Sequence, residues 1–186
     1  MKGYIRTAVV LACICAVAAV LLAVVNSVTT PYIEAYENEK VTRALEEVSN
    51  GLSIGEKTVV EEGCIDYLHP LYENGNHAGY VLGLTTRGYG GDITLLAGYD
   101  ASGAVTAVTI VSDSETPGVG KKAHNEGYMD KFIGKGGSGE VVPTSKSMLS
   151  ETDSAAVSGA TMTFSGISSA LKEGADYIYA MKEASR

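Results

Sequence analysis

Two short segments of this 186-residue sequence carry residue types that could hold an anionic ligand. The first runs from Ser114 to Lys122, reads SETPGVGKK, and combines a Pro-Gly turn, a second glycine and two cations. Glycine lets a backbone approach a ligand closely, and backbone amides beside Lys121 attract an anion. The second runs from Ser158 to Thr163, reads SGATMT, and consists mainly of small and hydroxylated residues.

The segment SGATMT directly precedes a predicted amphipathic C-terminal helix. Apolar side chains recur there at helical spacing, at Phe164, Ile167, Leu171, Ala175, Ile178 and Met181 or Lys182. A phosphate bound at this segment would face the positive end of the helix. Serine and threonine are also common helix caps. The residues alone therefore leave a helix cap and a phosphate site as alternatives.

The region from Cys64 to Ser112 is predicted to supply a sheet. The runs CIDYLHPLYE and AGYVLGLTT flank a turn signal at residues 74–76, and ITLLAGYD and AVTAVTIVS flank another at residues 101–103. The second hairpin is more apolar and more β-branched, so we expect it at the centre of the sheet. The predicted fold class is α+β, with an antiparallel sheet and flanking helices.

The N-terminus predicts a membrane anchor over residues 1–30. No residue from Thr7 to Val28 is charged, and such a stretch spans about 33 Å as a helix, against about 30 Å for a bilayer core. The apolar region of a signal peptide is shorter, at about 7 to 15 residues. Lys2 and Arg6 precede the span, so the remainder is expected outside the cytoplasm. Residues 31–57 are predicted to form a stalk helix and linker, and residues 58–186 the folded domain.

Composition excludes several classes of protein. The net charge of −8 and pI near 4.9 argue against nucleic acid as a partner, and 45% hydrophobic residues argue against disorder. Cys13 and Cys15 lie in the apolar span and Cys64 is alone outside it, so no disulfide framework is predicted. We expect Cys64 to be an inert core residue rather than a reactive thiol, and the spacing of carboxylates and histidines gives no metal site.

Ser158-Gly159-Ala160-Thr161 resembles the SGAT attachment motif of the FMN-binding domains in Rnf and Na+-translocating NADH:quinone reductase complexes. GYGGDI at residues 88–93 and ETPGVG at residues 115–120 resemble two further blocks of the RnfG family, in the same order and with matching spacing. The N-terminal span and the predicted stalk helix also match that family. The resemblance covers nearly the whole chain.

The resemblance implies that Thr161 carries FMN through a phosphoester bond, with Thr163 as a less favoured acceptor. Ser158, Gly159 and Ala160 would form the small approach to Thr161. The flavin site would further be lined by the second block, Glu115, Thr116, Pro117, Gly118, Val119 and Gly120, together with Lys121. Family members usually carry aspartate three residues before the SGAT serine, where this chain has Ala155. Asp153 lies two residues earlier and could serve in its place.

The function implied is that of a membrane-anchored electron-transfer subunit of an Rnf-type ion-translocating oxidoreductase, which couples ferredoxin and NAD redox chemistry to ion movement. No independent catalysis is expected. The implied partners are the other complex subunits, membrane lipid through the N-terminal helix, and a flavin transferase that uses FAD for maturation. Two alternatives remain open: a free-standing extracytoplasmic flavoprotein, and a non-redox anchored binding module in which SGAT is a helix cap.

Overall fold

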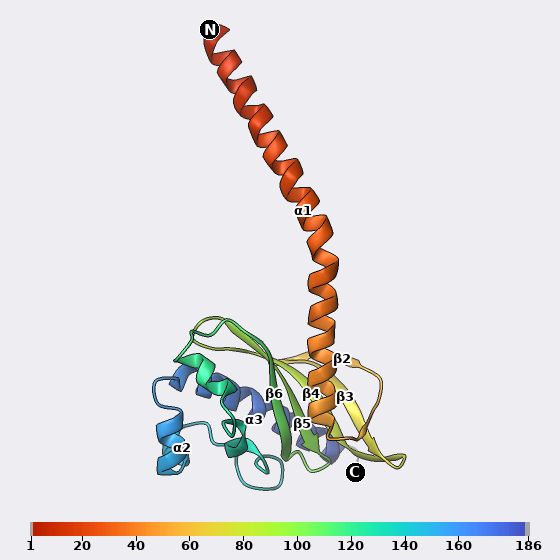
Figure 1. The fold of residues 1–186 in the computed structure, drawn as a ribbon. Coiled ribbons are helices and arrows are strands. Elements are labelled where there is room, and N and C mark those ends of the chain that lie inside the picture. Colours follow the sequence, from red (N-terminus) through yellow and green to blue (C-terminus); the bar gives the residue numbers. More distant parts are fainter. Residues whose placement is uncertain (1, 185–186) are drawn as a thin grey trace. The chain divides into compact units, whose positions relative to one another are not determined.

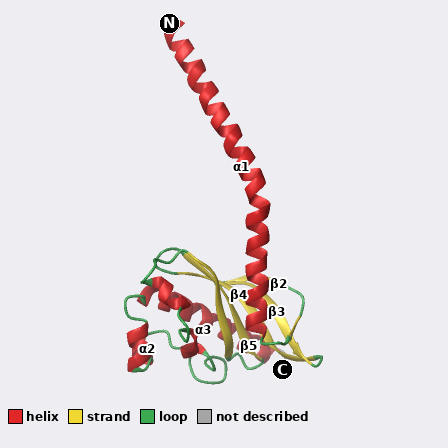
Figure 2. Ribbon diagram, in the orientation of Figure 1, coloured by secondary structure: helices red, strands yellow, loops and turns green. Residues whose placement is uncertain are grey.

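The structure, a computed structural model, describes residues 2–184 (Figures 1 and 2). It begins with the long helix α1 (Lys2–Ser49), which contains Pro31 and ends where Asn50 and Gly51 take positive φ angles of 50° and 82°. Residues in this left-handed conformation commonly end a helix. The chain divides into two compact units between Val41 and Thr42. The last turns of α1 therefore belong to the same unit as the sheet.

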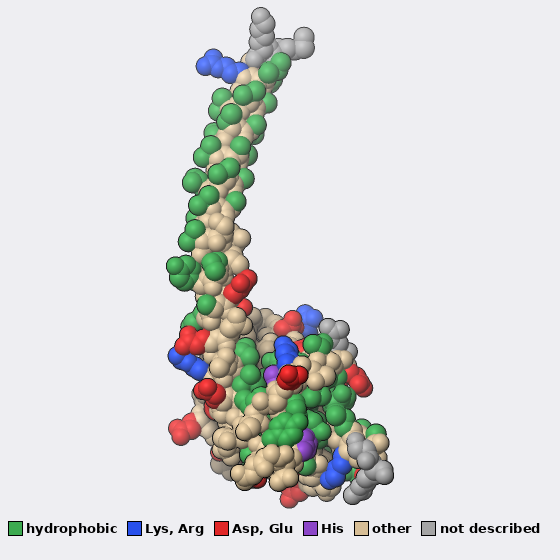
Figure 3. Space-filling view, turned by 90° about the vertical axis from the view of Figure 1, so that its right-hand side faces the viewer, with side chains coloured by type: hydrophobic (Ala, Val, Ile, Leu, Met, Phe, Trp, Pro, Cys, Tyr) green, Lys and Arg blue, Asp and Glu red, His purple; other side chains and the backbone are tan. Residues whose placement is uncertain are grey.

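The first unit is an exposed apolar helix. Its large hydrophobic side chains are exposed, Leu22 by 71%, and Figure 3 shows them along the face of the helix that is turned to the viewer. The helix is long and apolar enough to cross a membrane. A surface of this kind is stable in lipid and costly in water.

The second unit is built on one antiparallel sheet. Within the described residues its strands are β1 (Ser53–Ile54), β2 (Thr58–Glu62), β3 (Ile65–Glu73), β4 (Asn76–Arg87), β5 (Asp92–Asp100) and β6 (Val105–Asp113). The order is β1-β3-β4-β5-β6, and β2 pairs beside β1 along β3. Both hairpins predicted from the sequence, β3–β4 and β5–β6, are present. The α+β prediction is confirmed.

The two faces of the sheet are covered by different helices. Leu82, Leu95 and Tyr99 face the amphipathic helix α3 (Thr161–Ala184) in the larger core, and the intervening residues Val81 and Leu96 face the other way. On that second face Ala44 and Val48, from the last turns of α1, complete a smaller core. Alternate side chains of each strand therefore serve different cores, as the period of two requires.

The second hairpin does not lie at the centre of the sheet. β5 is an interior strand, but β6 forms the edge beyond it. The apolar sequence of β6 has another cause, because both of its faces are covered: Val108 and Ile110 pack against the larger core, and Ala107 and Val111 against the smaller one. An edge strand between two cores needs apolar residues on both faces, which a centre-or-edge rule does not foresee.

Helix α3 lies unusually close to the sheet at two glycines. A β-carbon at Gly166 would lie 2.4 Å from the Arg87 carbonyl oxygen, and one at Gly174 would lie 2.3 Å from Oη of Tyr99. Tyr99 is fully buried and donates a hydrogen bond of 3.0 Å to the Leu171 carbonyl. These contacts fix where the first residue of α3, Thr161, stands relative to β4 and β5.

The predicted apolar face of the C-terminal helix is confirmed, since the side chains of Phe164, Ile167, Leu171, Ala175 and Ile178 are all buried. Between β6 and α3 the chain forms the short helices η1 (Gly120–His124), η2 (Met129–Phe132), η3 (Lys146–Met148) and α2 (Glu151–Ala156).

Cys64 lies half-buried at the start of β3, against α3. Its Sγ lies 3.8 Å from the Ala170 carbonyl oxygen, and its backbone amide donates to the Glu173 carboxylate at 3.0 Å. Burial, and secondarily the negative charge of Glu173, raises the pKa of the Cys64 thiol to about 12. Cys64 is therefore the inert thiol expected from the sequence.

Candidate functional site

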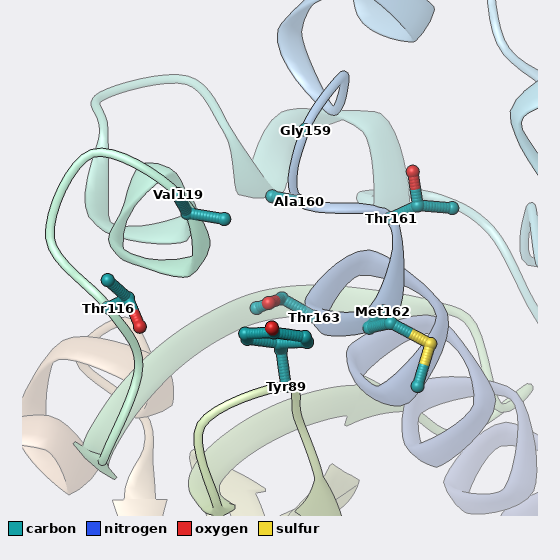
Figure 4. A pocket seen from close by; sticks show the side chains of 8 residues that line it. All are labelled: Tyr89, Thr116, Val119, Gly159, Ala160, Thr161, Met162 and Thr163. Atoms are coloured by element: carbon teal, nitrogen blue, oxygen red, sulfur yellow. The ribbon is translucent and has the colours of Figure 1, made fainter.

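Three loops meet where α3 begins: the turn between β4 and β5 at residues 88–91, the loop after β6 at residues 114–119, and the segment before α3 at residues 157–160. Figure 4 shows side chains from all three around one space. The three sequence motifs, although far apart along the chain, therefore form a single site. Antiparallel pairing brings the first two together, because Ile93 at the start of β5 is paired with Asp113 at the end of β6.

Glu115 ties the three loops together. Its side chain is only 3% exposed and accepts hydrogen bonds from the Gly90 amide at 3.1 Å and from Oγ1 of Thr163 at 2.9 Å. A β-carbon at Gly88 or Gly120 would lie 2.0 Å or 1.7 Å from a carboxylate oxygen, so a side chain at either position would displace the carboxylate. Within residues 2–184 no lysine, arginine or histidine forms an ion pair with it. The carboxylate is held by neutral donors, and its role is to position loops.

Above this carboxylate lies an open cavity of about 610 Å³. It is lined by Tyr89, Thr116, Val119, Gly159, Ala160, Thr161, Met162 and Thr163. Small-molecule sites commonly measure about 300 to 1,000 Å³ and have mainly apolar walls. The size and the mainly apolar walls of this cavity are those of a small-molecule site.

Thr161 stands at the rim of the cavity as the first residue of α3. Its side chain is exposed, and in Figure 4 its hydroxyl points away from Tyr89. The first amides of a helix have no intrahelical acceptor, so they attract an anion to this end. Thr163 differs, because its side chain is fully buried and its hydroxyl is already bonded to Glu115.

The two lysines of the SETPGVGKK segment have different partners. Nζ of Lys121 lies 3.6 Å from the Asp113 carboxylate, and Lys121 does not line the cavity. Nζ of Lys122 donates a hydrogen bond of 2.9 Å to the Ser158 carbonyl. Lys122, not Lys121, is therefore the cation that stands beside the SGAT segment.

Asp113 anchors the loop that carries Glu115. Its carboxylate accepts the Glu115 amide at 2.8 Å and lies 2.5 Å from Nε2 of His124. Burial by itself raises the pKa of Asp113, but the hydrogen bonds from His124 and from the Glu115 amide, with the charge of Lys121, hold it below its ordinary value. Asp113 is therefore ionised wherever the domain is folded at neutral pH.

The predicted site residues fall into three groups. Those that line the cavity are Thr116, Val119, Gly159, Ala160, Thr161 and Thr163. Buried beneath it are Glu115 and Gly120. Outside its lining lie Pro117, Gly118, Ser158 and Lys121.

Sequence reasoning missed Tyr89 and Met162 as cavity walls. Tyr89 is the only residue with a side chain among the four of the turn at residues 88–91, and it is 69% exposed. Met162 lies off the apolar face of α3 and is 63% exposed. A large apolar residue at a position that packing does not need is the signal that could have found both.

Ala155, the position where the resemblance leads one to expect aspartate, is exposed on α2. Asp153 is already engaged, because its carboxylate accepts from Oγ of Ser150 at 2.7 Å in the cap of α2. Asp153 could replace the missing carboxylate only by giving up that contact.

Comparison with known proteins agrees with the three motifs. The FMN-binding domain family matches residues 88–176, and the RnfG N-terminal region matches residues 2–48. The chain is 32% identical over 185 residues to the G subunit of the Na(+)-translocating ferredoxin:NAD(+) oxidoreductase complex of Acetobacterium woodii, covering 90% of this chain and 88% of that one. This chain belongs to the RnfG family.

Two further likenesses support this assignment. The G subunit of the proton-translocating ferredoxin:NAD(+) oxidoreductase complex of Clostridium ljungdahlii is 32% identical over 99 residues, which cover 53% of this chain and 52% of that one. The crystal structure of Shewanella oneidensis NqrC shares the fold, with a TM-score of 0.51, 19% identity and 69% of each chain covered. Together with the apolar helix, membership of this family makes the protein a membrane-anchored chain with an FMN-binding domain.

The residues present fit FMN. The apolar cavity suits the flavin ring system, and the helix N-terminus at Thr161, with Lys122 beside Ser158, suits a phosphate.

Proposed function

We propose that this RnfG chain is the electron carrier of an Rnf-type complex, with FMN joined through its phosphate to the hydroxyl of Thr161. In this proposal the complex couples ferredoxin and NAD redox chemistry to ion movement, and this chain carries electrons. The observation that supports it most directly is an exposed threonine hydroxyl at the start of α3, on the rim of an apolar cavity of about 610 Å³. When bound, FMN supplies reversible redox chemistry that no side chain offers.

The phosphate would be held by the covalent bond more than by the surrounding charges. A helix N-terminus contributes typically about 0.3 to 1 kcal/mol to binding an anion, which is too little to retain a cofactor. Lys122 adds a cation: its Nζ donates to the Ser158 carbonyl and would lie 3.6 Å from a β-carbon at Gly159. These groups would orient the phosphate at Thr161, while the mainly apolar cavity walls would contact the ring system.

Attachment would require a partner enzyme. The cavity lining contains no histidine, aspartate or glutamate that could accept the proton of Thr161. A flavin transferase would therefore activate the hydroxyl. Its oxygen would form a bond to the FMN phosphorus of FAD, the pyrophosphate bond would break, AMP would leave, and the threonine proton would pass to the transferase.

The domain is proposed to lie on the extracytoplasmic side of the membrane. Lys2 and Arg6 precede the apolar helix, and short cationic flanks stay in the cytoplasm. Protease added to intact spheroplasts should digest the domain. Digestion only after lysis would show that the domain lies on the cytoplasmic side and would contradict the proposed orientation.

The attachment is tested by the intact mass of the chain purified from its native membrane or co-expressed with a flavin transferase. We expect an increase equal to one FMN less one water, and its loss in Thr161→Val, which keeps the side-chain shape but removes the oxygen. Thr161→Ser should restore it.

The control for this experiment is Thr163→Ser. It keeps the hydroxyl that Glu115 needs, so the domain should fold and load normally. Loading that persists in Thr161→Val would refute the proposed attachment residue, and a wild-type chain without the mass increase would refute covalent FMN altogether.

A further inference from the structure

Tyr89 is held in the cavity wall by a turn that accepts no other side chain. The Gly88 amide donates to the Gly91 carbonyl at 2.8 Å, and the Gly90 amide donates to Glu115. A β-carbon at Gly90 would lie 2.2 Å from the Ser114 carbonyl oxygen, and one at Gly88 would meet Glu115. These contacts hold the backbone of the turn that carries the ring of Tyr89 in one conformation.

The ring of Tyr89 is directed at the cavity and not at the protein. Figure 4 shows the ring edge-on, with one face turned toward Val119 and Ala160 across the cavity. The side chain is 69% exposed, and among the described residues it makes no hydrogen bond and no ring contact. The ring is therefore available to contact a ligand in the cavity that it lines.

We propose that Tyr89 is the stacking partner of the flavin ring system and so a positioning residue of the site. This inference rests on the proposed function and adds to it the surface on which the ring lies. Flat aromatic systems prefer offset stacking on a ring face, and Val119 and Ala160 supply the facing apolar surface. The phosphate bond fixes one end of the cofactor, and Tyr89 fixes the orientation of the other.

The readout is the fluorescence of the bound flavin, because a phenol in contact with an excited flavin donates an electron to it and quenches its emission. Full-length protein is co-expressed with a flavin transferase, and emission is measured per bound FMN, first folded and then after unfolding in denaturant. The wild type should be dim when folded and brighten on unfolding. Tyr89→Leu should already have, when folded, the brightness of the unfolded chain.

Two variants separate contact from general structure. Tyr89→Phe keeps the stacking ring but removes the phenol, so it should brighten while keeping the wild-type visible circular dichroism of the flavin, which Tyr89→Leu should lose. Tyr179→Leu alters another exposed tyrosine, on the last turns of α3, and should leave emission and dichroism unchanged.

The possible failures are distinguishable by mass. A chain that carries FMN but shows equal folded emission in the wild type and Tyr89→Leu would overturn the role of Tyr89 alone. A wild-type chain without bound FMN would overturn the proposed function and this inference with it.

Discussion

The first turn and the middle of helix α3 are packed in opposite ways. Along its middle, Ile167 and Leu171 are fully buried, and Gly174 lies against the hydroxyl of Tyr99 with no space between them. At its first turn Met162 is exposed, and an open cavity lies beside it. Complete packing fixes the helix, and incomplete packing at its end leaves room for a ligand.

The buried middle of α3 stabilises the domain, whereas the exposed residues beside the cavity contribute little to its stability. Burying a large apolar side chain contributes roughly 1.5 to 3 kcal/mol, and Tyr89 and Met162 forgo most of that. The loops around them are held by the polar network of Glu115 instead. The site therefore depends on hydrogen bonds that the rest of the core does not need.

The largest effect is expected from Glu115→Ala, which removes that network. It leaves the fully buried Thr163 hydroxyl without an acceptor, and an unsatisfied buried group costs about 1 to 3 kcal/mol. The exposed Gly90 amide also loses its acceptor, but water can replace it. Denaturant unfolding should show this loss in the free energy of unfolding, together with loss of flavin loading. Glu115→Gln, which keeps the shape and one acceptor oxygen, should lose clearly less. Equal stability of wild type and Glu115→Ala would show that the loops are held by other contacts.

A smaller effect is expected at the packed part of the helix. In Gly174→Ala the new methyl group meets Oη of Tyr99 at 2.3 Å, and overpacking of this kind costs about 1 to 3 kcal/mol. Thermal unfolding should move to lower temperature while folded protein still loads FMN fully. Ser169→Ala, at an exposed position of the same helix, is the matched control and should not be destabilised. Loss of loading in folded Gly174→Ala would mean that the packed middle of α3 is coupled to its first turn.

The smallest effect is expected from acid. Because the folded pKa of Asp113 lies below its unfolded value of about 3.8, its contribution is complete above that value and is lost as the pH falls through the lower folded one. The difference in free energy of unfolding between wild type and Asp113→Asn should thus shrink as the pH falls below about 4. The pKa of Asp100 is also lowered, but Asp100 is present in both chains and cancels in the difference. A difference that does not change with pH would rule out Asp113 as an acid-sensitive anchor of the loop.

The sequence predicted those parts of the fold that depend on local pattern. Helical spacing from Phe164 to Ile178 indicated α3, and the turn signals at residues 74–76 and 101–103 indicated both hairpins. The predicted position of β6, at the centre of the sheet, was wrong. Strand order depends on which faces of the sheet are covered, and no local sequence pattern indicates that the end of α1 covers one of them.

The site was predicted as motifs and not as an arrangement. SGAT at a helix N-terminus follows from the chain order, but the contacts between loops do not. The structure seats Lys122 beside Ser158, whereas Lys121 turns to Asp113. Adjacent lysines look equivalent in a sequence, and only the direction of each side chain on η1 separates them. The attachment of FMN and the roles of the individual site residues stay predictions.

The protonated state of Cys64 has a practical and a physiological consequence. With a pKa of about 12, roughly one thiol in 10⁵ is ionised at pH 7. Peroxide formed when a reduced flavin meets oxygen would therefore find no reactive thiolate at this position. For the same reason Cys64 should react slowly with thiol reagents in the folded domain. A cysteine introduced at an exposed position near the cavity could therefore be labelled selectively, while the cysteines of the apolar helix remain in lipid.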